Sequence, residues 1–455
     1  MQWLQEAEKR KDEMVQSLCQ WLKINSVYDS TTVGEGAPFG RGVKEALEYI
    51  VDLAEKDGFA AVNDEGYACH IDYGQGDKIV GILGHVDLVP EGDGWKYPPY
   101  SATVADGRIY SRGTQDDKGP MMAAYFAVKI IRDLGLPISK KIRLILGGNE
   151  ERDWLCVDHY FKKYPRPDCG FTPDGSFPLI FAEKEIQMYA FTGKHSSDSI
   201  ISLKGGTAPN SVPDKAVAVI KPGEGIKEAF DTYLQDHKLK GSCVEKPEGL
   251  ELHVTGIGAH GSTPEVGVNA VVHLMKFLKA QTGDAMISHF ADVLGGYNGE
   301  GLGIDFESKI SGKLTANLGI ASYEDGAYRF VLDSRYPMEV DIPKMKASIR
   351  AKTTGLPWES NMEETGFKKG IFVDLDSHLV KTLLKAYVDH TKDTESKPLA
   401  IGGGTYARAT ENVVCFGMAF PHTEPLAHQK NENVVIDELV LATAIYAQAI
   451  YELAK

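Results

Sequence analysis

Apolar positions over the first 180 residues follow helical spacing in some stretches and strand spacing in others. Apolar residues at i, i+3 and i+4 predict amphipathic helices, whereas short apolar runs between turn residues predict strands. The clearest strand lies in IVGILGHVDLVP, residues 79–90, which is apolar until it reaches His85 and Asp87. We also expect helices at 3–24, 42–56, 119–134 and 153–163, and strands at 60–63, 67–73, 141–146 and 169–172. This alternation predicts an α/β domain with a mixed, mostly parallel sheet covered on both faces.

The pattern changes near residue 185, where strands become more frequent and helices fewer. We expect strands at 187–192, 199–203, 251–257, 314–320 and 328–336, and helices at 227–237, 268–280 and 342–352. These elements are typical of an α+β domain with an antiparallel sheet. Helix and strand alternate again after residue 372, up to a final helix at 432–454. The prediction is therefore one discontinuous α/β domain, residues 1–184 and 373–455, with an α+β domain of residues 185–372 inserted in it.

Histidine and acidic residues gather where the predicted strands end. Residues two apart on a strand point to the same face, so His85 and Asp87 should emerge together at a carboxyl end, where open α/β sheets hold ligands. His85 is a candidate metal ligand, and Asp87 could fix its tautomer by accepting the second ring N–H. Taken alone, the pair could simply end a strand. The comparable polar positions elsewhere are Asp116, Asp117, Glu150, Glu151, Asp174 and, far downstream, His428.

Two divalent cations ~3.5–4 Å apart need about this set of side chains. We assign Asp116 as the bridging carboxylate. The other ligands are His85 and Asp174 for one cation, and Glu151 and His428 for the second. Glu150 is adjacent to a ligand but unused, so it could act as the base toward a water activated by the cations. Taken singly, these residues could be purely structural, because an Asp-Asp pair can cap a helix and a Glu-Glu pair can belong to a solvated face.

Charge and cysteine usage narrow the class of protein. The 455 residues carry a formal net charge of −15, which disfavours binding to nucleic acid or to an anionic membrane and is compatible with a cation site. The six cysteines have no CxxC spacing and no secretory leader precedes them, which predicts reduced thiols in a cytoplasmic protein. No run approaches the ~18 apolar residues of a membrane span.

The sequence resembles the M20 family of metallopeptidases, and within it the bacterial PepV-like dipeptidases. The matching motifs span nearly the whole chain in the order of the family. They are GHVDLVP at 84–90, SRGTQDDKGP at 111–120, NEE at 149–151, FTPDGSFP at 171–178, APNSVPD at 208–214, GIGAHGSTPEVGVNA at 256–270, DSRYP at 333–337, IGGGTYAR at 401–408 and AHQKNE at 427–432. The resemblance implies a catalytic α/β domain with two Zn²⁺ or Mn²⁺ ions and an inserted lid domain. It also implies a cis peptide bond between Asp116 and Asp117.

The resemblance further assigns residues that would contact the substrate. His260 would reach the reacting carbonyl oxygen and stabilise an oxyanion, with Asn210 as a second polar contact from the lid. Arg335 would bind the free carboxylate of a dipeptide. The backbone N–H groups of Gly403, Gly404 and Thr405 would bind the same carboxylate. The alternatives are a loop histidine, a surface salt-bridge arginine and an ordinary glycine turn.

The expected function is a metal-dependent dipeptidase of broad specificity, acting on small dipeptides as a monomer or homodimer. One alternative is a deacylase of N-acyl amino acids that uses the same dimetal centre. A second alternative is a catalytically silent binding protein, which the intact set of ligands and base disfavours. The chain departs from the family at Arg152 and Asp153, where relatives tend to have a small residue and glycine. The resemblance therefore does not predict the shape of the adjacent pocket or the choice of substrate.

Overall fold

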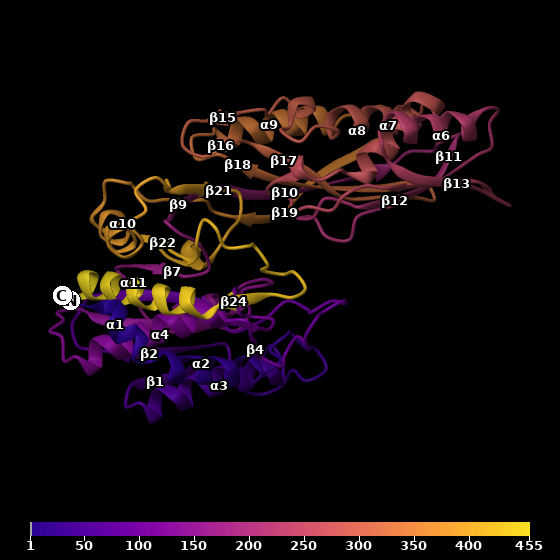
Figure 1. Ribbon diagram of the computed structural model, residues 1–455. Helices are drawn as coiled ribbons and strands as arrows, with labels where there is room; N and C mark the ends of the chain where they lie inside the picture. Colours follow the sequence, from indigo (N-terminus) through magenta and orange to yellow (C-terminus); the bar gives the residue numbers. More distant parts are fainter. Residues whose placement is uncertain (1) are drawn as a thin grey trace. The chain divides into compact units, whose positions relative to one another are not determined.

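The computed structural model describes residues 2–455, which divide into two compact units (Figure 1). Unit 1 contains residues 1–181, 372–399 and 404–455, and unit 2 contains residues 182–371 and 400–403. The predicted domain boundaries after residues 184 and 372 stay predictions, and each unit is described separately below.

A mixed sheet forms the centre of unit 1. Its strands run in the order β1-β2-β6-β3-β7-β22-β9-β20, and β21 also pairs with β9. The neighbours β6, β3, β7 and β22 are parallel, whereas β1 and β2 are antiparallel. The bounds are β1 Ala60–Asp64, β2 Ala68–Tyr73, β3 Ile79–His85, β6 Lys141–Gly147, β7 Cys169–Thr172, β9 Ile180–Glu183, β20 Ile371–Phe372, β21 Leu399–Ile401 and β22 Val413–Cys415. All seven residues of β3 are buried, as its apolar run predicts.

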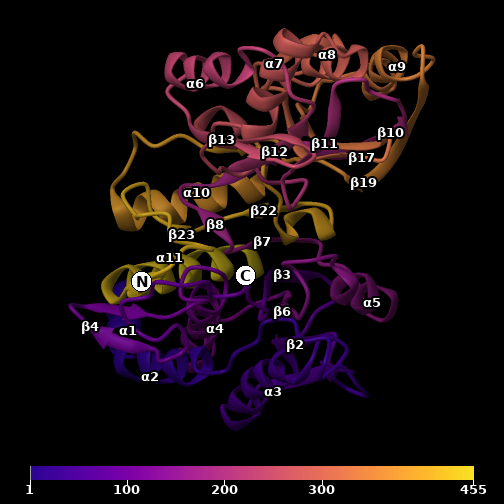
Figure 2. The ribbon, with the colours of Figure 1, turned by 90° about the vertical axis from the view of Figure 1, so that its right-hand side faces the viewer.

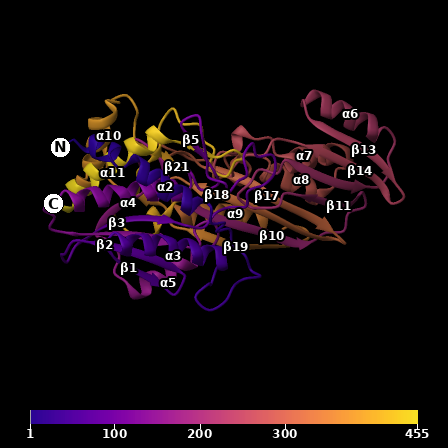
Figure 3. The ribbon, with the colours of Figure 1, turned by 60° about the horizontal axis from the view of Figure 1, so that its bottom comes forward.

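Helices cover both faces of this sheet. Figure 3 shows α2 and α4 on one face of β2 and β3, and α3 and α5 on the other. Helices α4 and α11 pack against each other and against β3, while α3 contacts β1 and β2. The bounds are α1 Trp3–Glu8, α2 Lys11–Leu22, α3 Arg41–Lys56, α4 Lys118–Asp133, α5 Leu155–Lys163, α10 His378–Thr391 and α11 Ile436–Ala454. The predicted α/β class with a mixed sheet is confirmed, and the parallel pairings lie at its centre, among β6, β3, β7 and β22.

Unit 2 is built on an antiparallel sheet of eight strands in the order β13-β14-β12-β11-β17-β18-β10-β19. Their bounds are β10 Glu185–Lys194, β11 Ile200–Gly205, β12 Lys215–Ile220, β13 Lys240–Lys246, β14 Gly249–Thr255, β17 Thr315–Glu324, β18 Ala327–Tyr336 and β19 Glu359–Lys368. Helices α6 Ile226–Asp236, α7 Ala270–Thr282, α8 Ala285–Val293 and α9 Ile342–Thr353 lie along one side of it (Figure 2). Apolar residues of the sheet and of these helices form one buried core. The predicted α+β class with an antiparallel sheet is confirmed.

Two predicted helices differ from the structure by more than a shift of one or two residues at an end. The helix expected over 3–24 is two helices, α1 and α2, separated at residues 9 and 10. The last helix begins at Ile436 rather than at residue 432, because β24, Asn433–Val435, pairs with β5, Arg108–Tyr110. None of the helices within residues 2–455 is both long and apolar enough to cross a bilayer.

Candidate metal centre

Three neighbouring parallel strands of unit 1 deliver polar residues to one edge of the sheet. His85 is the last residue of β3 and lies opposite Gly147, the last residue of β6. Glu150 and Glu151 lie three and four residues beyond the end of β6, and Asp174 lies two residues beyond the end of β7, on the other side of β3. Because the carboxyl ends of parallel strands lie at the same edge of a sheet, residues at or just beyond these ends are close to one another.

The Asp116 carboxylate lies between two histidines. Its Oδ1 is 2.9 Å from Nε2 of His85, and its Oδ2 is 2.8 Å from Nε2 of His428. The other two carboxylates lie on opposite sides of it, since Asp174 Oδ2 is 3.8 Å from His85 Nε2 and Glu151 Oε1 is 2.9 Å from His428 Nε2. The five predicted ligands are thus brought together in unit 1, in the two groups that the sequence predicts.

His428 comes from the segment between residues 423 and 433, which does not follow a strand of the central sheet. Its backbone has φ 63°, a left-handed conformation that turns the chain sharply. Its side chain is half-exposed, whereas those of the other four ligands are less than a fifth exposed. The centre therefore opens to solvent on the His428 side.

Asp87 and Glu150 also lie at this centre. The Nδ1 atom of His85 is 3.0 Å from the backbone oxygen of Asp87 and 3.4 Å from its carboxylate Oδ1. The Asp87 carboxylate accepts hydrogen bonds from the backbone N–H groups of Glu150, at 3.0 Å, and Glu151, at 3.1 Å. Asp87 therefore supports the orientation of His85 partly through its main chain and also fixes the turn that carries both glutamates. The Glu150 carboxylate lies within 4.8 Å of the ligand atoms of His85 and Asp174.

Asp117 has a structural role that the sequence did not reveal. It occupies the N-cap position of α4, but its side chain makes no cap hydrogen bond. Its Oδ2 instead accepts a hydrogen bond from the backbone N–H of His85, at 3.1 Å. This contact requires glycine at position 84, because a Cβ atom there would lie 2.2 Å from the same Asp117 oxygen. The peptide bond between Asp116 and Asp117 is cis, as the resemblance implies.

Electrostatics within the protein are unusual at this centre. Burial lowers the pKa of His428, but hydrogen bonds to Asp116 and Glu151 outweigh it and raise the pKa to about 11. The pKa of Asp174 is raised well above its ordinary value by burial and by the nearby charge of Asp116. The same two causes raise the pKa of Glu151. Three carboxylates that burial brings this close repel one another, so added positive charge would stabilise the arrangement.

The residues fit a pair of divalent cations. Nε2 of His85 and Oδ1 of Asp116 are buried 2.9 Å apart, and neither atom has another hydrogen-bond partner among residues 2–455. Two imidazoles, two terminal carboxylates and one carboxylate with an oxygen directed to each side form a donor set suited to Zn²⁺ or Mn²⁺. His85, Asp116 and Asp174 would hold one cation, and Asp116, Glu151 and His428 the other.

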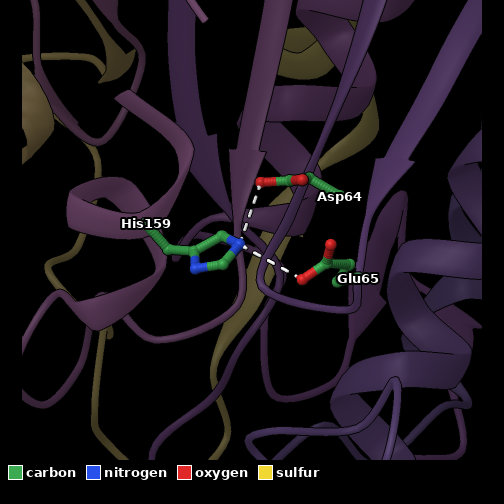
Figure 4. Close-up of side chains that lie close together, drawn as sticks. All are labelled: Asp64, Glu65 and His159. Atoms are coloured by element: carbon green, nitrogen blue, oxygen red, sulfur yellow. Dashed lines mark ion pairs between the residues drawn. The ribbon is translucent and has the colours of Figure 1, made fainter. Parts of the chain in front are cut away.

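A second group of potential ligands lies where the hairpin between β1 and β2 meets α5. Nε2 of His159 is 3.5 Å from carboxylate oxygens of both Asp64 and Glu65 (Figure 4). However, the ammonium group of Lys163 lies 2.9 Å from the other oxygen of each carboxylate. This cluster already contains a cation, so we interpret it as an ion-pair network that joins the hairpin to α5.

The substrate-contacting residues predicted from the resemblance lie mostly in unit 2. His260 pairs with Ser211 in an isolated β-bridge, and the backbone oxygen of Asn210 accepts a hydrogen bond from Gly261 at 2.7 Å. Nδ1 of His260 lies 2.6 Å from the Ser262 hydroxyl. The structure therefore places His260 and Asn210 side by side. Their contacts to a substrate stay predictions.

Arg335 is buried rather than on the surface, being only 3% exposed. Its Nη2 and Nε atoms donate to Oδ2 of Asp333, and Nη1 donates to the backbone oxygen of Gly402 at 3.2 Å. The glycine loop and the arginine predicted to share a carboxylate are thus neighbours at Gly402. In the same loop, the Thr405 hydroxyl accepts a hydrogen bond from the backbone N–H of Ala407.

Arg152, the departure from the family pattern, lies against an aromatic ring. Its guanidinium carbon is 4.1 Å from the ring centroid of Tyr28. The chain next to Tyr28 is paired with the segment that follows His85, since Val27 and Leu88 form a β-bridge. Stacking on Tyr28 gives the exposed Arg152 a defined direction close to the ligand Glu151.

Comparisons with known proteins agree with this geometry. The family model described as Peptidase family M20/M25/M40 matches residues 81–452. A protein of Bacillus subtilis (strain 168) named "Putative dipeptidase YtjP" is 40% identical over 469 residues, covering 100% of both chains. A protein of Staphylococcus haemolyticus named "Putative dipeptidase SH1171" is 36% identical over 99% of both. The crystal structure of human carnosine dipeptidase 1 shares the fold, with a TM-score of 0.58 at 15% identity, covering 99% of this chain and 98% of that one. The chain belongs to peptidase family M20/M25/M40.

Proposed function

We propose that this protein is a dipeptidase of broad specificity that depends on two divalent cations, Zn²⁺ or Mn²⁺. The observation that carries the proposal is the Asp116 carboxylate, which directs one oxygen toward His85 and the other toward His428. The names of relatives that match along their full length support dipeptides as the substrate class. No comparable observation favours the deacylase alternative.

Each residue at the centre has a proposed task. Cations held by these residues would lower the pKa of water toward ~7 and polarise the peptide carbonyl. Glu150 would act as the base, taking a proton from the attacking water as the water oxygen bonds to the carbonyl carbon. The C–N bond then breaks, and Glu150 passes the proton to the leaving amine. The Asp87 carboxylate keeps Glu150 in place by accepting hydrogen bonds from the backbone N–H groups of residues 150 and 151.

Metal removal tests the proposal directly. We expect the chelator-treated protein to lose hydrolysis of a neutral L,L-dipeptide and to regain it when Zn²⁺ or Mn²⁺ is added, because a carboxylate such as Glu150 is too weak a base to deprotonate water whose pKa no cation has lowered. The N-acetylated form of the same dipeptide should be a poor substrate. Dipeptide hydrolysis that continues without metal would contradict the proposal, and preference for the acetylated form would support the deacylase.

Arg335 is the proposed contact for the free carboxylate of the substrate. Arg335→Ala would leave Asp333 buried without its partner, which costs about 3–5 kcal/mol of stability, so the informative variant is Arg335→Lys. A lysine lacks the planar fork of donors. We expect the ratio of kcat/KM for a dipeptide to that for its C-terminal amide to fall about tenfold or more. Taking this ratio on a single variant removes any effect of reduced folding.

The control for this variant lies on the same strand. Arg329 on β18 is exposed, and Arg329→Lys should leave the selectivity ratio unchanged. If Arg335→Lys also leaves the ratio of kcat/KM for the dipeptide to that for its amide unchanged, Arg335 has only a structural role in unit 2.

A cytoplasmic location is part of the proposal. All six cysteines are free thiols, three of them buried, as expected for a protein kept in a reducing compartment.

A further inference from the structure

Two segments far apart in sequence are joined beside the metal centre. One is residues 111–117, which ends in Asp116 and Asp117, and the other is residues 424–433, which carries His428. Each supplies part of the predicted second cation site, so the geometry of that site depends on how the two are held. The contacts between them form a compact network around Arg112, Gln115 and Glu432.

The centre of this network is a buried ion pair. Arg112 is 1% exposed and Glu432 0% exposed, and Nη1 of Arg112 lies 2.7 Å from Oε2 of Glu432. The same Nη1 donates to the backbone oxygen of Gln429, the residue after His428, at 3.1 Å. The guanidinium carbon lies 5.2 Å from the centroid of the Trp95 ring. The pair is therefore fixed in position and holds the main chain next to His428.

The other oxygen of Glu432 faces the main chain at Asp116. It accepts hydrogen bonds from the backbone N–H of Gln115 at 2.8 Å and, with a longer contact of 3.4 Å, from that of Asp116. One carboxylate thus connects the backbone of the bridging ligand to the arginine that holds the His428 segment. The hydrogen bond from the charged guanidinium of Arg112 is of the stronger kind, so Glu432 is held firmly between the two segments.

Gln115 adds a second connection with its side chain. Its Nε2 donates to the backbone oxygens of Glu424, at 3.1 Å, and Asn433, at 2.9 Å, and its Oε1 accepts from the backbone N–H of Leu426 at 3.0 Å. These partners lie on both sides of His428 in the chain. The turn that presents His428 is therefore fixed at both ends by the residue that precedes Asp116.

We propose that Glu432 and Gln115 are positioning residues that set the affinity of the second cation site by holding Asp116 opposite His428. Neither side chain needs to touch a cation or a substrate for this role. Groups that orient ligands from outside a metal site typically change its affinity 10–100-fold when they are replaced. The inference rests on the proposed metal-dependent function.

The experiment measures cation binding rather than turnover. Metal-depleted protein is titrated with Zn²⁺, and the two dissociation constants are obtained by calorimetry for the parent, Gln115→Met and Glu432→Gln. In both variants we expect one of the two dissociation constants to rise about 10–100-fold and the other to stay near the parental value. The single variant His428→Gln should weaken the same site. Adding Glu432→Gln or Gln115→Met to His428→Gln should cause little additional loss of affinity, because both changes act on one site.

Stability is separated from positioning by two further variants. Replacing only one member of the buried pair would leave the other charge without a partner. The double variant Arg112→Met/Glu432→Met avoids this, so its stability should stay near that of the parent while its affinity for the cation still falls. Asp57→Asn breaks another ion pair of unit 1, to Lys129, which lies about three turns along α4 from its start. It should lower the melting temperature without changing either dissociation constant.

The outcomes are distinct. A parent that binds no Zn²⁺ would contradict the proposed function itself. A parent that binds two ions, with folded Gln115→Met and Arg112→Met/Glu432→Met variants that bind both equally well, would overturn the positioning role alone.

Discussion

Glu150→Gln is expected to lower kcat for dipeptide hydrolysis about 10²–10⁴-fold while both cations stay bound. Glutamine has nearly the same shape as glutamate but cannot accept a proton at neutral pH, so the variant removes proton transfer alone. The side chain lies within 4.8 Å of ligand atoms of His85 and Asp174, close enough to serve a water held there. Turnover is measured at saturating Zn²⁺ or Mn²⁺, and bound metal by elemental analysis of the same sample.

The adjacent residues provide the comparison. Glu151→Gln should chiefly weaken metal binding, because its Oε1 lies 2.9 Å from Nε2 of His428. Asp153→Asn changes an exposed carboxylate three residues along the chain and should alter neither property. Near-parental kcat in metal-loaded Glu150→Gln would exclude Glu150 as the base, and loss of metal from it would assign Glu150 to the ligands.

The convergence of His85, Glu151 and Asp174 could be predicted from the sequence because it follows from the sheet. Each residue comes at or just after the end of an apolar strand, and β6, β3 and β7 are parallel neighbours. Parallel neighbours with helical crossovers place such ends at one edge. For these residues, local hydrophobic patterning is enough to place the site.

His428 could not be placed by this reasoning. Its segment follows no strand of the central sheet, and its position depends on Gln115 and Arg112, more than 300 residues away in sequence. In the sequence it is a candidate ligand far downstream of the others, and the resemblance of AHQKNE to the family motif supports that assignment. Glu432 could not be placed by local patterning either, because the pattern put it at the start of a helix although β24 comes between. Contacts of this kind depend on tertiary packing, which leaves no periodic signal in the sequence.

Two of the strands missed in unit 2 are polar edge strands, whereas the inner strand β12 and helix α8 were missed although they are apolar. KGSCVEK of β13 and ESNMEETGFK of β19 show no apolar alternation, and most of their side chains are exposed. Both lie at the edges of the sheet, where one side of the strand has no partner and charged residues discourage association. The inner strands β10, β17 and β18 bury one face or more, so their pattern predicted them.

Asp116→Asn is expected to have the largest effect on metal binding, because it changes both cation sites at once. Asp116 is the residue whose two oxygens lie within 3 Å of two predicted histidine ligands, at 2.9 Å from His85 and 2.8 Å from His428. Asparagine offers one oxygen and an N–H₂ group in place of two charged oxygens, so it cannot bridge. We expect loss of both cations from the purified variant and no measurable dipeptide hydrolysis at stoichiometric metal.

Thermal unfolding in the presence and absence of Zn²⁺ gives a second measurement of the same effect. A cation at 100 times its dissociation constant stabilises the native state by about 2.7 kcal/mol, which raises the melting temperature of the parent. Asp116→Asn should show almost none of this rise, whereas Asp174→Asn and His428→Gln should each keep part of it, because each changes one site. This difference between the variants is expected only if one carboxylate serves both sites. If the two sites shared no ligand, each of the three variants would lose only part of the rise. A full rise in Asp116→Asn would therefore show that cations bind without this bridge.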